Sequence, residues 1–282
     1  MPTVLLAGCG AIGTALGIRL LEAGHAVIGL RRSALPMPFP TLQADFTAPL
    51  DPGLFNQPID YVVHTATPAE RSDAGYQRAY PGSVAHLLRA LQGHPLKRFF
   101  FVSSTAVYAQ NAGEWVDESS TTAPDNFNGI RMLEAEQYLL HSGVPATCVR
   151  FGGIYGQGRN YLIRRVQNGA EVQCDPPSYT NRIHQDDCVG LLAFLIEHCN
   201  TGAALEDIYL GVDNDPASEE DVCRWLARQL GAPDPVCKPA VNAGQNKRCR
   251  NDRIRALGYE FHYPDFRSGY RAVLAQAGLS AD

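Results

Sequence analysis

The chain has 282 residues, of which 45% are hydrophobic and 19% are charged, and its formal net charge is −5. This length allows one large domain or two modest ones around a full hydrophobic core. The negative charge and the absence of any long Lys/Arg block lead us to expect no nucleic-acid partner. No apolar run reaches the length of a membrane span, and no signal-peptide pattern precedes the first expected strand. We therefore expect a cytoplasmic protein with no membrane partner.

The start of the chain predicts a dinucleotide-binding turn. A short apolar run over 3–7 indicates a buried strand, and an apolar helical pattern extends to Leu21. Between them, Gly8 permits a tight turn, Gly10 lets backbone approach a pyrophosphate, and Gly13 lets the helix pack close on the strand. Free N–H groups at the start of that helix would face the phosphates. We expect the cofactor diphosphate to be held by Gly8, Gly10, Ala11, Ile12 and Gly13.

The second expected strand, 26–30, ends on Arg31-Arg32-Ser33. This position meets the adenosine ribose, where an acidic residue binds the 2′-hydroxyl of NAD and an arginine accommodates the 2′-phosphate of NADP. Arg31 and Arg32 therefore favour NADP, with NAD as the alternative cofactor. The competing interpretation is a solvated loop that happens to be basic.

Two further strand ends contribute candidate cofactor contacts. The expected third strand, 41–46, ends near Asp45, which would bind the adenine amine or cap the following turn. A strand from 60 breaks into a small-residue loop at Ala66 and Thr67, which are expected near the nicotinamide-side ribose because strand carboxyl ends face the ligand crevice. A helix is expected over 76–91.

The β-rich run 98–102 leads into a cluster of hydroxyl residues at its carboxyl end. We expect Ser103 beside the cofactor and Ser104 in hydrogen-bond reach of a substrate carbonyl or hydroxyl. The alternative is a turn in which these hydroxyls satisfy local backbone groups. A helix over 130–141 and a strand over 144–151 follow.

Beyond residue 151 the alternation of strands and helices weakens. A glycine-dense segment over 152–159 precedes a helix over 161–168, and 181–187 opens another helix that extends to 195. A strand is expected over 207–212, and a helix over 218–230 begins with Ser218 in a capping box. Because the guanidinium fork matches phosphate geometry, Arg159 and Arg182 are candidates to bind an anionic substrate, with Lys247 or Arg248 as further candidates. The alternative for these cations is surface and interdomain ion pairing. Tyr155 is a further candidate substrate contact.

The eight cysteines are scattered, with no CxxC spacing. Most lie in apolar segments, where thiols behave as small hydrophobic side chains. We expect this role for all eight, and we expect no metal site.

Several ordered motifs together resemble the short-chain dehydrogenase/reductase superfamily, in its extended branch of epimerases and dehydratases. They are Gly8–Gly13, Phe101–Tyr108, Arg150–Gly158, Asn181–Asp187 and the C-terminal Asn246-Lys-Arg with Leu257-Gly-Tyr259. The resemblance implies an α/β fold with a Rossmann doubly wound parallel sheet and a smaller C-terminal α/β substrate domain. The implied limits are 1–150 plus about 186–212 for the NAD(P)-binding domain, and 151–185 plus 213–282 for the substrate domain. Relatives of this kind also imply a possible homodimer.

The family's chemistry uses a Ser or Thr with a Tyr and a Lys spaced as YxxxK, and the family serine matches Ser104. Matching Gly129 and the pair Glu136-Gln137 places Asn128 at the tyrosine and Met132 at the lysine. A shift by one residue offers Phe127 and Arg131 instead. Neither alignment supplies a group that exchanges a proton near neutral pH.

Two hypotheses follow from this departure. The first is an NADP-dependent oxidoreductase or epimerase/dehydratase-like enzyme that acts on a small polar or nucleotide-linked substrate with a non-standard proton donor. Candidate donors are Tyr76, His64, Tyr108, Tyr155 and His184. The second is a catalytically silent NADP-binding or sensing protein.

Overall fold

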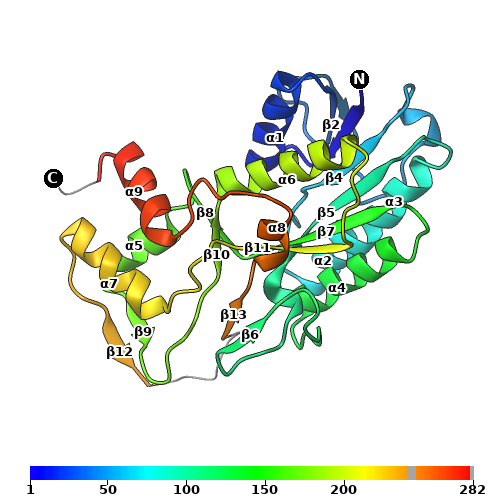
Figure 1. Ribbon diagram of the computed structural model, residues 1–282. Helices are drawn as coiled ribbons and strands as arrows, with labels where there is room; N and C mark the ends of the chain where they lie inside the picture. The colour runs from blue at the N-terminus through cyan, green and yellow to red at the C-terminus, as the bar shows by residue number, and fades with distance from the viewer. Residues whose placement is uncertain (240–245, 280–282) are drawn as a thin grey trace. The chain divides into compact units, whose positions relative to one another are not determined.

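The computed structural model describes residues 1–239 and 246–279, and it divides into two compact units (Figure 1). Unit 1 contains residues 1–107, 122–150 and 189–209, and unit 2 contains 108–121, 151–188 and 210–282. Segment 108–121 thus belongs with the later part of the chain, although the implied limits grouped it with the first domain. Substrate binding by unit 2 stays a prediction.

Unit 1 is built on a seven-stranded parallel sheet, which confirms the predicted Rossmann α/β fold. The strand order is β11-β7-β5-β4-β1-β2-β3, so successive strands run outward from β1 and then reverse direction at β4. Ligands of such sheets bind at the carboxyl ends of the strands beside this reversal. The strands are Thr3–Ala7 (β1), Ala26–Arg31 (β2), Thr41–Gln43 (β3), Tyr61–His64 (β4), Arg98–Ser104 (β5), Ala146–Phe151 (β7) and Ile208–Gly211 (β11).

The central strands are buried on both faces. All residues of β4 and the stretch 4–7 of β1 have no exposed surface, as do the three phenylalanines 99–101 of β5. In register, Leu5 lies between Ile28 of β2 and Val62 of β4. Continuous apolar runs of this kind are typical of parallel strands covered by helices on both sides. The third strand is shorter than predicted: it ends at Gln43, whereas the prediction extended it to residue 46.

Helices cover both faces of this sheet (Figure 1). One face has α1 (Ala11–Glu22) and α6 (Gln185–Asn200). His25, in the turn after α1, forms a hydrogen bond with Glu197 of α6. The other face has α2 (Asp73–Gln77), α3 (Ser83–Ala90) and α4 (Phe127–Leu140). Within the described ranges, no helix is both long and apolar enough to cross a membrane.

The helix expected over 76–91 differs from the prediction in two ways. It begins at Asp73, because the Ser72 hydroxyl accepts a hydrogen bond from the Gly75 N–H and caps the first turn. It also contains a π-helical turn over Arg78–Gly82 with Pro81 inside. Proline has no N–H for the regular ladder, so this wider turn accommodates it. Two short 3-10 helices, Pro52–Leu54 and Thr105–Val107, complete unit 1.

Unit 2 consists of short strand pairs and helices around a core of its own. Its parallel strand pairs are β6 with β13, β8 with β10, and β9 with β12. The strands are Glu114–Val116 (β6), Gly153–Tyr155 (β8), Glu171–Gln173 (β9), Arg182–His184 (β10), Val236–Lys238 (β12) and Lys247–Cys249 (β13). The helices are Tyr161–Gln167 (α5), Glu219–Leu230 (α7), Asp252–Ala256 (α8) and Phe266–Gln276 (α9). The predicted cap of α7 is present, since Ser218 accepts from the Asp221 N–H at 3.0 Å.

The cysteine prediction is wrong at two positions, because Cys174 and Cys237 form a disulfide within unit 2. The two residues are 63 apart in sequence and meet only because β9 and β12 pair. Closing a loop of that length lowers the entropy of the unfolded chain, worth about 4 kcal/mol in the chain-entropy model. The other cysteines are free, and Cys9, Cys148, Cys188, Cys223 and Cys249 are buried as expected.

A buried ion pair joins α4 to the sheet of unit 1. Arg150 at the end of β7 donates from Nη2 to Glu136 Oε2 at 2.6 Å and from Nε to Oε1 at 3.0 Å. Both side chains are almost fully buried, with 3% and 1% of their surface exposed. Ser103 at the end of β5 donates its hydroxyl to the same carboxylate. One carboxylate thus connects α4 to two neighbouring strands.

This pair generates a prediction about stability. Glu136→Gln leaves the Arg150 charge buried without its counterion, which we expect to lower the free energy of unfolding by about 3–5 kcal/mol. The double variant Glu136→Leu/Arg150→Met removes both charges and should be less destabilised than Glu136→Gln alone. Urea denaturation measures both effects. Arg131→Gln, which breaks a partly exposed ion pair between α4 and Asp73 of α2, is the matched control and should change the midpoint little. Equal effects of Glu136→Gln and Arg131→Gln would contradict the structural role of the buried pair.

Candidate functional site

The turn between β1 and α1 is closely packed on one side and open on the other. Gly8 has a φ of +104°, and a Cβ there would lie 2.7 Å from the Ala66 backbone nitrogen. A Cβ on Gly13 would lie 2.1 Å from the Gly8 carbonyl oxygen. By contrast, a Cβ on Gly10 would meet no atom within 4 Å. The structure shows the tight turn at Gly8 and the close packing at Gly13 that the sequence predicted. Of the three glycines Gly10 alone borders open space, and its contact with a pyrophosphate stays a prediction.

The start of α1 offers that open space a set of free N–H groups. The helix begins at Ala11 with Gly10 as its N-cap, and its first turn has no acidic side chain. The first N–H groups of a helix have no acceptor within the helix, and the helix dipole is positive there. Ala11, Ile12 and Gly13 thus provide donors beside a surface without side chains. These residues fit the diphosphate of a dinucleotide, which is the group that such turns bind.

The end of β4 lies directly against this turn. The Thr65 hydroxyl donates to the Gly8 carbonyl oxygen at 2.6 Å, and the Thr65 N–H donates to Ala7 at 2.9 Å. Ala66 then contacts Gly8 through its backbone, and Thr67 is exposed. The structure thus brings the predicted residue Ala66 together with the glycine turn, and Thr67 follows it along the loop.

Arg31 ends β2, and Arg32 follows it. The Arg31 guanidinium donates to the Ser33 hydroxyl and to the Met37 sulfur, both at 2.9 Å. The Arg32 side chain is exposed. Neither arginine forms an ion pair with a carboxylate among the described residues. The charge of Arg32 also helps to lower the pKa of Asp45, although the two side chains form no ion pair. Two cations therefore stand where the adenosine ribose of a bound dinucleotide is expected.

Asp45 lies in the loop after β3 and is exposed. Its Oδ1 accepts from the Thr47 hydroxyl at 2.7 Å and from the Thr47 N–H at 3.0 Å. The hydrogen bond from the Thr47 hydroxyl is the main cause that lowers the pKa of this carboxyl. Asp45 thus caps the turn, the second of the two roles that the sequence left open, and an adenine contact stays a prediction.

The two serines at the end of β5 use their hydroxyls differently. Ser103 is buried, and its hydroxyl is committed to Glu136. The Ser104 oxygen accepts from the Ala106 N–H at 3.1 Å, which forms the local turn that the sequence offered as an alternative. Because the Ser104 hydroxyl accepts in this bond, its proton remains available for donation to another oxygen. Both roles considered for Ser104 are therefore chemically compatible.

The start of α4 packs tightly under this turn. A Cβ on Gly129 would lie 2.4 Å from the Ala106 carbonyl oxygen, so the helix touches backbone there. Asn128 is half-buried, and Met132, one turn further along, is 5% exposed. Met132 thus fills a position in the core of unit 1 and has no proton to exchange.

Phe127 and Arg131, the two residues of the shifted alignment, lie on α4 and both contact α2. The Phe127 ring contacts the Tyr76 ring edge-on, with centroids 5.3 Å apart. Arg131 donates twice to Asp73, at 2.7 and 2.9 Å, and also to Glu134. Both residues therefore join α4 to α2.

In unit 2, Tyr155 and Arg182 are buried. The Tyr155 ring stacks on Tyr270 with centroids 4.4 Å apart and meets His184 edge-on at 5.2 Å. Arg182 lies over the Phe266 ring and donates to Thr180. Burial raises the pKa of the neighbouring Asp213 to about 8, although the charge of Arg182 opposes that rise. These predicted substrate residues thus belong to an interior cluster of unit 2.

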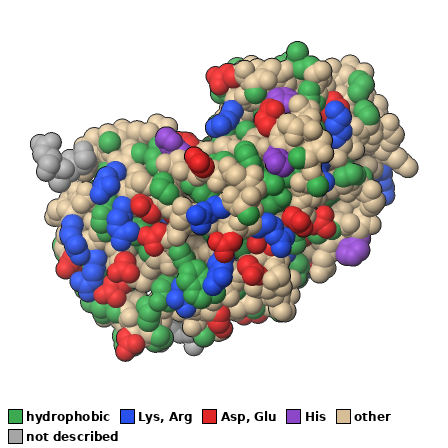
Figure 2. Space-filling model, viewed as in Figure 1, with side chains coloured by type: hydrophobic (Ala, Val, Ile, Leu, Met, Phe, Trp, Pro, Cys, Tyr) green, Lys and Arg blue, Asp and Glu red, His purple; other side chains and the backbone are tan. Residues whose placement is uncertain are grey.

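Arg159 lies instead at a surface pocket of about 460 Å³ within unit 2. Its charged lining includes Arg164 and Arg165, which the sequence analysis did not single out, although the pair follows Gly158-Arg159 closely. Arg165 pairs with Glu219, whereas Arg159 and Arg164 form no ion pair among the described residues. On the face shown in Figure 2, basic and acidic side chains of the described residues are interspersed and form no large basic patch. The pocket has the chemistry to hold an anionic group.

Comparison with known proteins identifies relatives of the whole chain. Residues 4–211 match the family model described as the NAD dependent epimerase/dehydratase family. A structure from Methylobacillus flagellatus, named as an NAD-dependent epimerase/dehydratase, is 39% identical, covers 98% of this chain and 99% of its own, and superimposes with a TM-score of 0.84.

Two more distant relatives have named activities. The 3-diazoavenalumate denitrifying reductase of a Streptomyces species is 27% identical and covers 94% of this chain and 98% of its own. A UDP-glucose 4-epimerase from Thermotoga maritima, solved with UDP-glucose, is 18% identical, covers 99% of both chains and has a TM-score of 0.81, which shows the fold alone.

The open space at Gly10 and the close contact at Gly13 predict different effects of adding a methyl group at the two positions. Gly10→Ala adds a methyl group to the open side, so the fold should persist while affinity for NADPH falls by about 10-fold or more. Gly13→Ala places its methyl group against the Gly8 carbonyl and should lower the melting temperature. Calorimetric titration and thermal unfolding of both variants measure these effects. Unchanged NADPH affinity in a folded Gly10→Ala variant would show that the dinucleotide does not lie on this turn.

Proposed function

The chain belongs to the NAD-dependent epimerase/dehydratase family, and we propose that it is an oxidoreductase that prefers NADP and acts on a small anionic substrate. The observation on which this rests is the open glycine turn together with Arg31 and Arg32, neither of which forms an ion pair with a carboxylate among the described residues. The turn suits the diphosphate, and the two guanidinium groups suit the additional phosphate of NADP. A bound nicotinamide would supply the hydride for reduction.

The proton in this proposal comes from a group outside the family's usual pair. No tyrosine of the chain is followed four residues later by a lysine. Among the tyrosines and histidines considered, His64 is fully buried and burial lowers its pKa to about 4. The Tyr108 hydroxyl donates a hydrogen bond to the Asp117 carbonyl oxygen. Tyr155 and His184 are buried in unit 2.

Tyr76 is the remaining candidate and the one that we propose. It is half-buried on α2, and its ring contacts Phe127, the residue before Asn128 at the start of α4. No hydrogen bond to its hydroxyl occurs among the described residues, so that proton is available. In this proposal Tyr76 donates its proton to the substrate oxygen while Ser104 donates a hydrogen bond to it.

The substrate class follows from the pocket around Arg159. Arg159 and Arg164 are exposed cations without carboxylate partners among the described residues. Asn160 and Asn168 add amide groups to the same lining. These donors favour a phosphate or carboxylate on the substrate. The nucleotide-linked ligand named for the Thermotoga relative is one member of that class.

A catalytically silent NADP-binding protein is the second candidate. It is favoured by the burial of Met132 and by the commitment of the Ser103 hydroxyl to Glu136. In this alternative the cofactor is bound and released unchanged.

Cofactor preference gives the first test of the proposal. Arg31→Asp replaces a cation beside the expected 2′-phosphate with an anion, which should weaken NADPH binding by about 10-fold or more and favour NADH. Fluorescence titration with both coenzymes measures the ratio of their dissociation constants. Arg19→Asp, on α1, is the matched charge control and should leave that ratio unchanged. A ratio that Arg31→Asp does not change would remove the assignment of this loop to NADP.

Turnover gives the second test. The wild-type protein with NADPH should reduce at least one member of a panel of phosphorylated or carboxylated carbonyl compounds, monitored by nicotinamide absorbance. Tyr76→Phe should then lower kcat by about 100-fold or more with unchanged NADPH affinity, because it removes the hydroxyl that donates the proton and keeps the ring. Tyr138→Phe, an exposed tyrosine on α4, is the control. Constant absorbance over the whole panel despite tight NADPH binding would favour the silent protein.

A further inference from the structure

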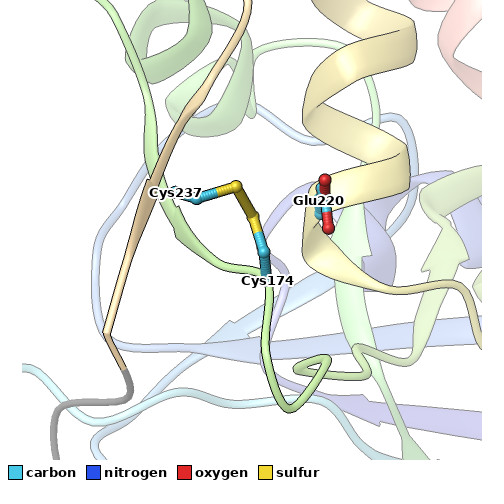
Figure 3. A group of neighbouring side chains, drawn as sticks. All are labelled: Cys174, Glu220 and Cys237. Atoms are coloured by element: carbon cyan, nitrogen blue, oxygen red, sulfur yellow. A yellow bond between two sulfur atoms is a disulfide. The ribbon is translucent and has the colours of Figure 1, made fainter.

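Cys174, Cys237 and Glu220 come together in unit 2 from three separate elements. Cys174 directly follows β9, Cys237 lies in β12, and Glu220 lies in the first turn of α7 (Figure 3). Their two sulfur atoms and one carboxylate oxygen lie within 4.8 Å of one another. The sulfur atoms form a disulfide, and the carboxylate stands beside it. We propose that the reduced form of this cluster is a Zn²⁺ site, so that the same residues alternate between a disulfide and a metal-bound dithiolate.

The dimensions of the cluster suit this alternation. Zn²⁺ binds thiolate sulfur at about 2.3 Å and carboxylate oxygen at about 2.0–2.2 Å, so tetrahedral ligands lie about 3.5–3.8 Å apart. The two Cα atoms are 5.5 Å apart, which lets both sulfur atoms approach one point by rotation of their side chains. Three protein ligands leave a fourth position for water.

Glu220 is held in place by a neighbour on its own helix. Arg224 donates from Nε to Glu220 Oε1 at 2.9 Å and from Nη2 to the same oxygen at 2.8 Å. Both of these contacts are made by Oε1. The other oxygen, Oε2, has no hydrogen-bond partner among the described residues. A carboxylate oriented by an arginine in this way is typical of metal sites, where outer partners fix the ligands.

Charge also favours the reduced, metal-bound form. Two thiolates and one carboxylate carry three negative charges, which Zn²⁺ reduces to one, and Arg224 lies beside that remaining charge. A neighbouring cation stabilises thiolates. The thiolate pair selects Zn²⁺ over Mg²⁺ or Ca²⁺, which prefer oxygen ligands.

The interconversion requires a dithiol reductant. The reductant supplies two electrons and two protons, the Cys174–Cys237 bond breaks to give two thiols, and the reductant becomes a disulfide. Zn²⁺ then binds both sulfur atoms and releases the two thiol protons to solvent. Compartments that keep thiols reduced favour this form.

The test is a Zn²⁺ titration of the full chain, reduced and oxidised, in competition with a chromogenic chelator. The reduced protein should bind one Zn²⁺ that the oxidised protein does not bind, and Co²⁺ in its place should give thiolate-to-metal absorption bands. Glu220→Gln should weaken binding by about 10- to 100-fold. Asp252→Asn, an exposed carboxylate in the first turn of α8, is the matched control and should have no effect.

The comparison of reduced with oxidised wild-type protein needs no substitution, so it remains decisive even where Cys174→Ser/Cys237→Ser fails to fold. Equal Zn²⁺ affinity of the two forms, or Co²⁺ spectra without thiolate bands, would overturn the proposal and leave a purely structural disulfide. Neither readout involves a nicotinamide cofactor, so the result is independent of the proposed oxidoreductase function.

Discussion

Close backbone contact at two glycines determines the arrangement of unit 1. Gly8 has no space for a side chain against Ala66, and Gly13 has none against the Gly8 carbonyl, where a Cβ would lie only 2.1 Å away. These contacts let α1 begin immediately beside the ends of β1 and β4. The N–H groups of its first turn therefore face the space beyond the sheet instead of other side chains. The diphosphate contacts that we propose for residues 8–13 depend on this close approach.

A second close approach positions the other helix of the candidate site. Gly129 places α4 against the Ala106 carbonyl, and the buried Glu136–Arg150 pair fixes the same helix one to two turns further along. Burying two charges costs desolvation energy, so such a pair is weak evidence for added stability. It does specify geometry, because the Glu136 carboxylate is also the acceptor for Ser103. Helix α4 is thus firmly positioned, with Asn128 and Met132 on it. In our proposal the proton comes from Tyr76, which lies against the first residue of this helix.

Local patterns in the sequence were enough to predict the strand, turn and helix at residues 3–22, since each glycine has a role within its own turn. Contacts between distant segments were not predictable in this way. Cys174 and Cys237 meet across 63 residues through a pair of three-residue strands, which are too short to show any periodicity. The π-helical turn at Pro81 was missed because hydrophobic spacing does not distinguish it from a regular helix. Cofactor contacts in the candidate site stay predictions, but the packing roles of Gly8 and Gly13 could be identified by residue type and position. The role of Ser104 could not, because it depends on one hydrogen bond to Ala106.

The two units are stabilised by different means, and this difference explains why the cysteine pair matters where it does. Unit 1 has a continuous sheet whose central strands are fully buried. The strand pairs of unit 2 are isolated and short, and such pairs are not stable by themselves. β12 illustrates the problem, since all three of its residues are exposed. It is held by its ladder to β9, by the Lys238–Glu171 ion pair and by the bond to Cys174. Simple reduction would remove one of these restraints. Zn²⁺ bound by both sulfur atoms would replace the lost restraint and, through Glu220, would add α7 to it. A metal-bound state therefore lets this part of the fold keep its cross-link under conditions that break disulfides.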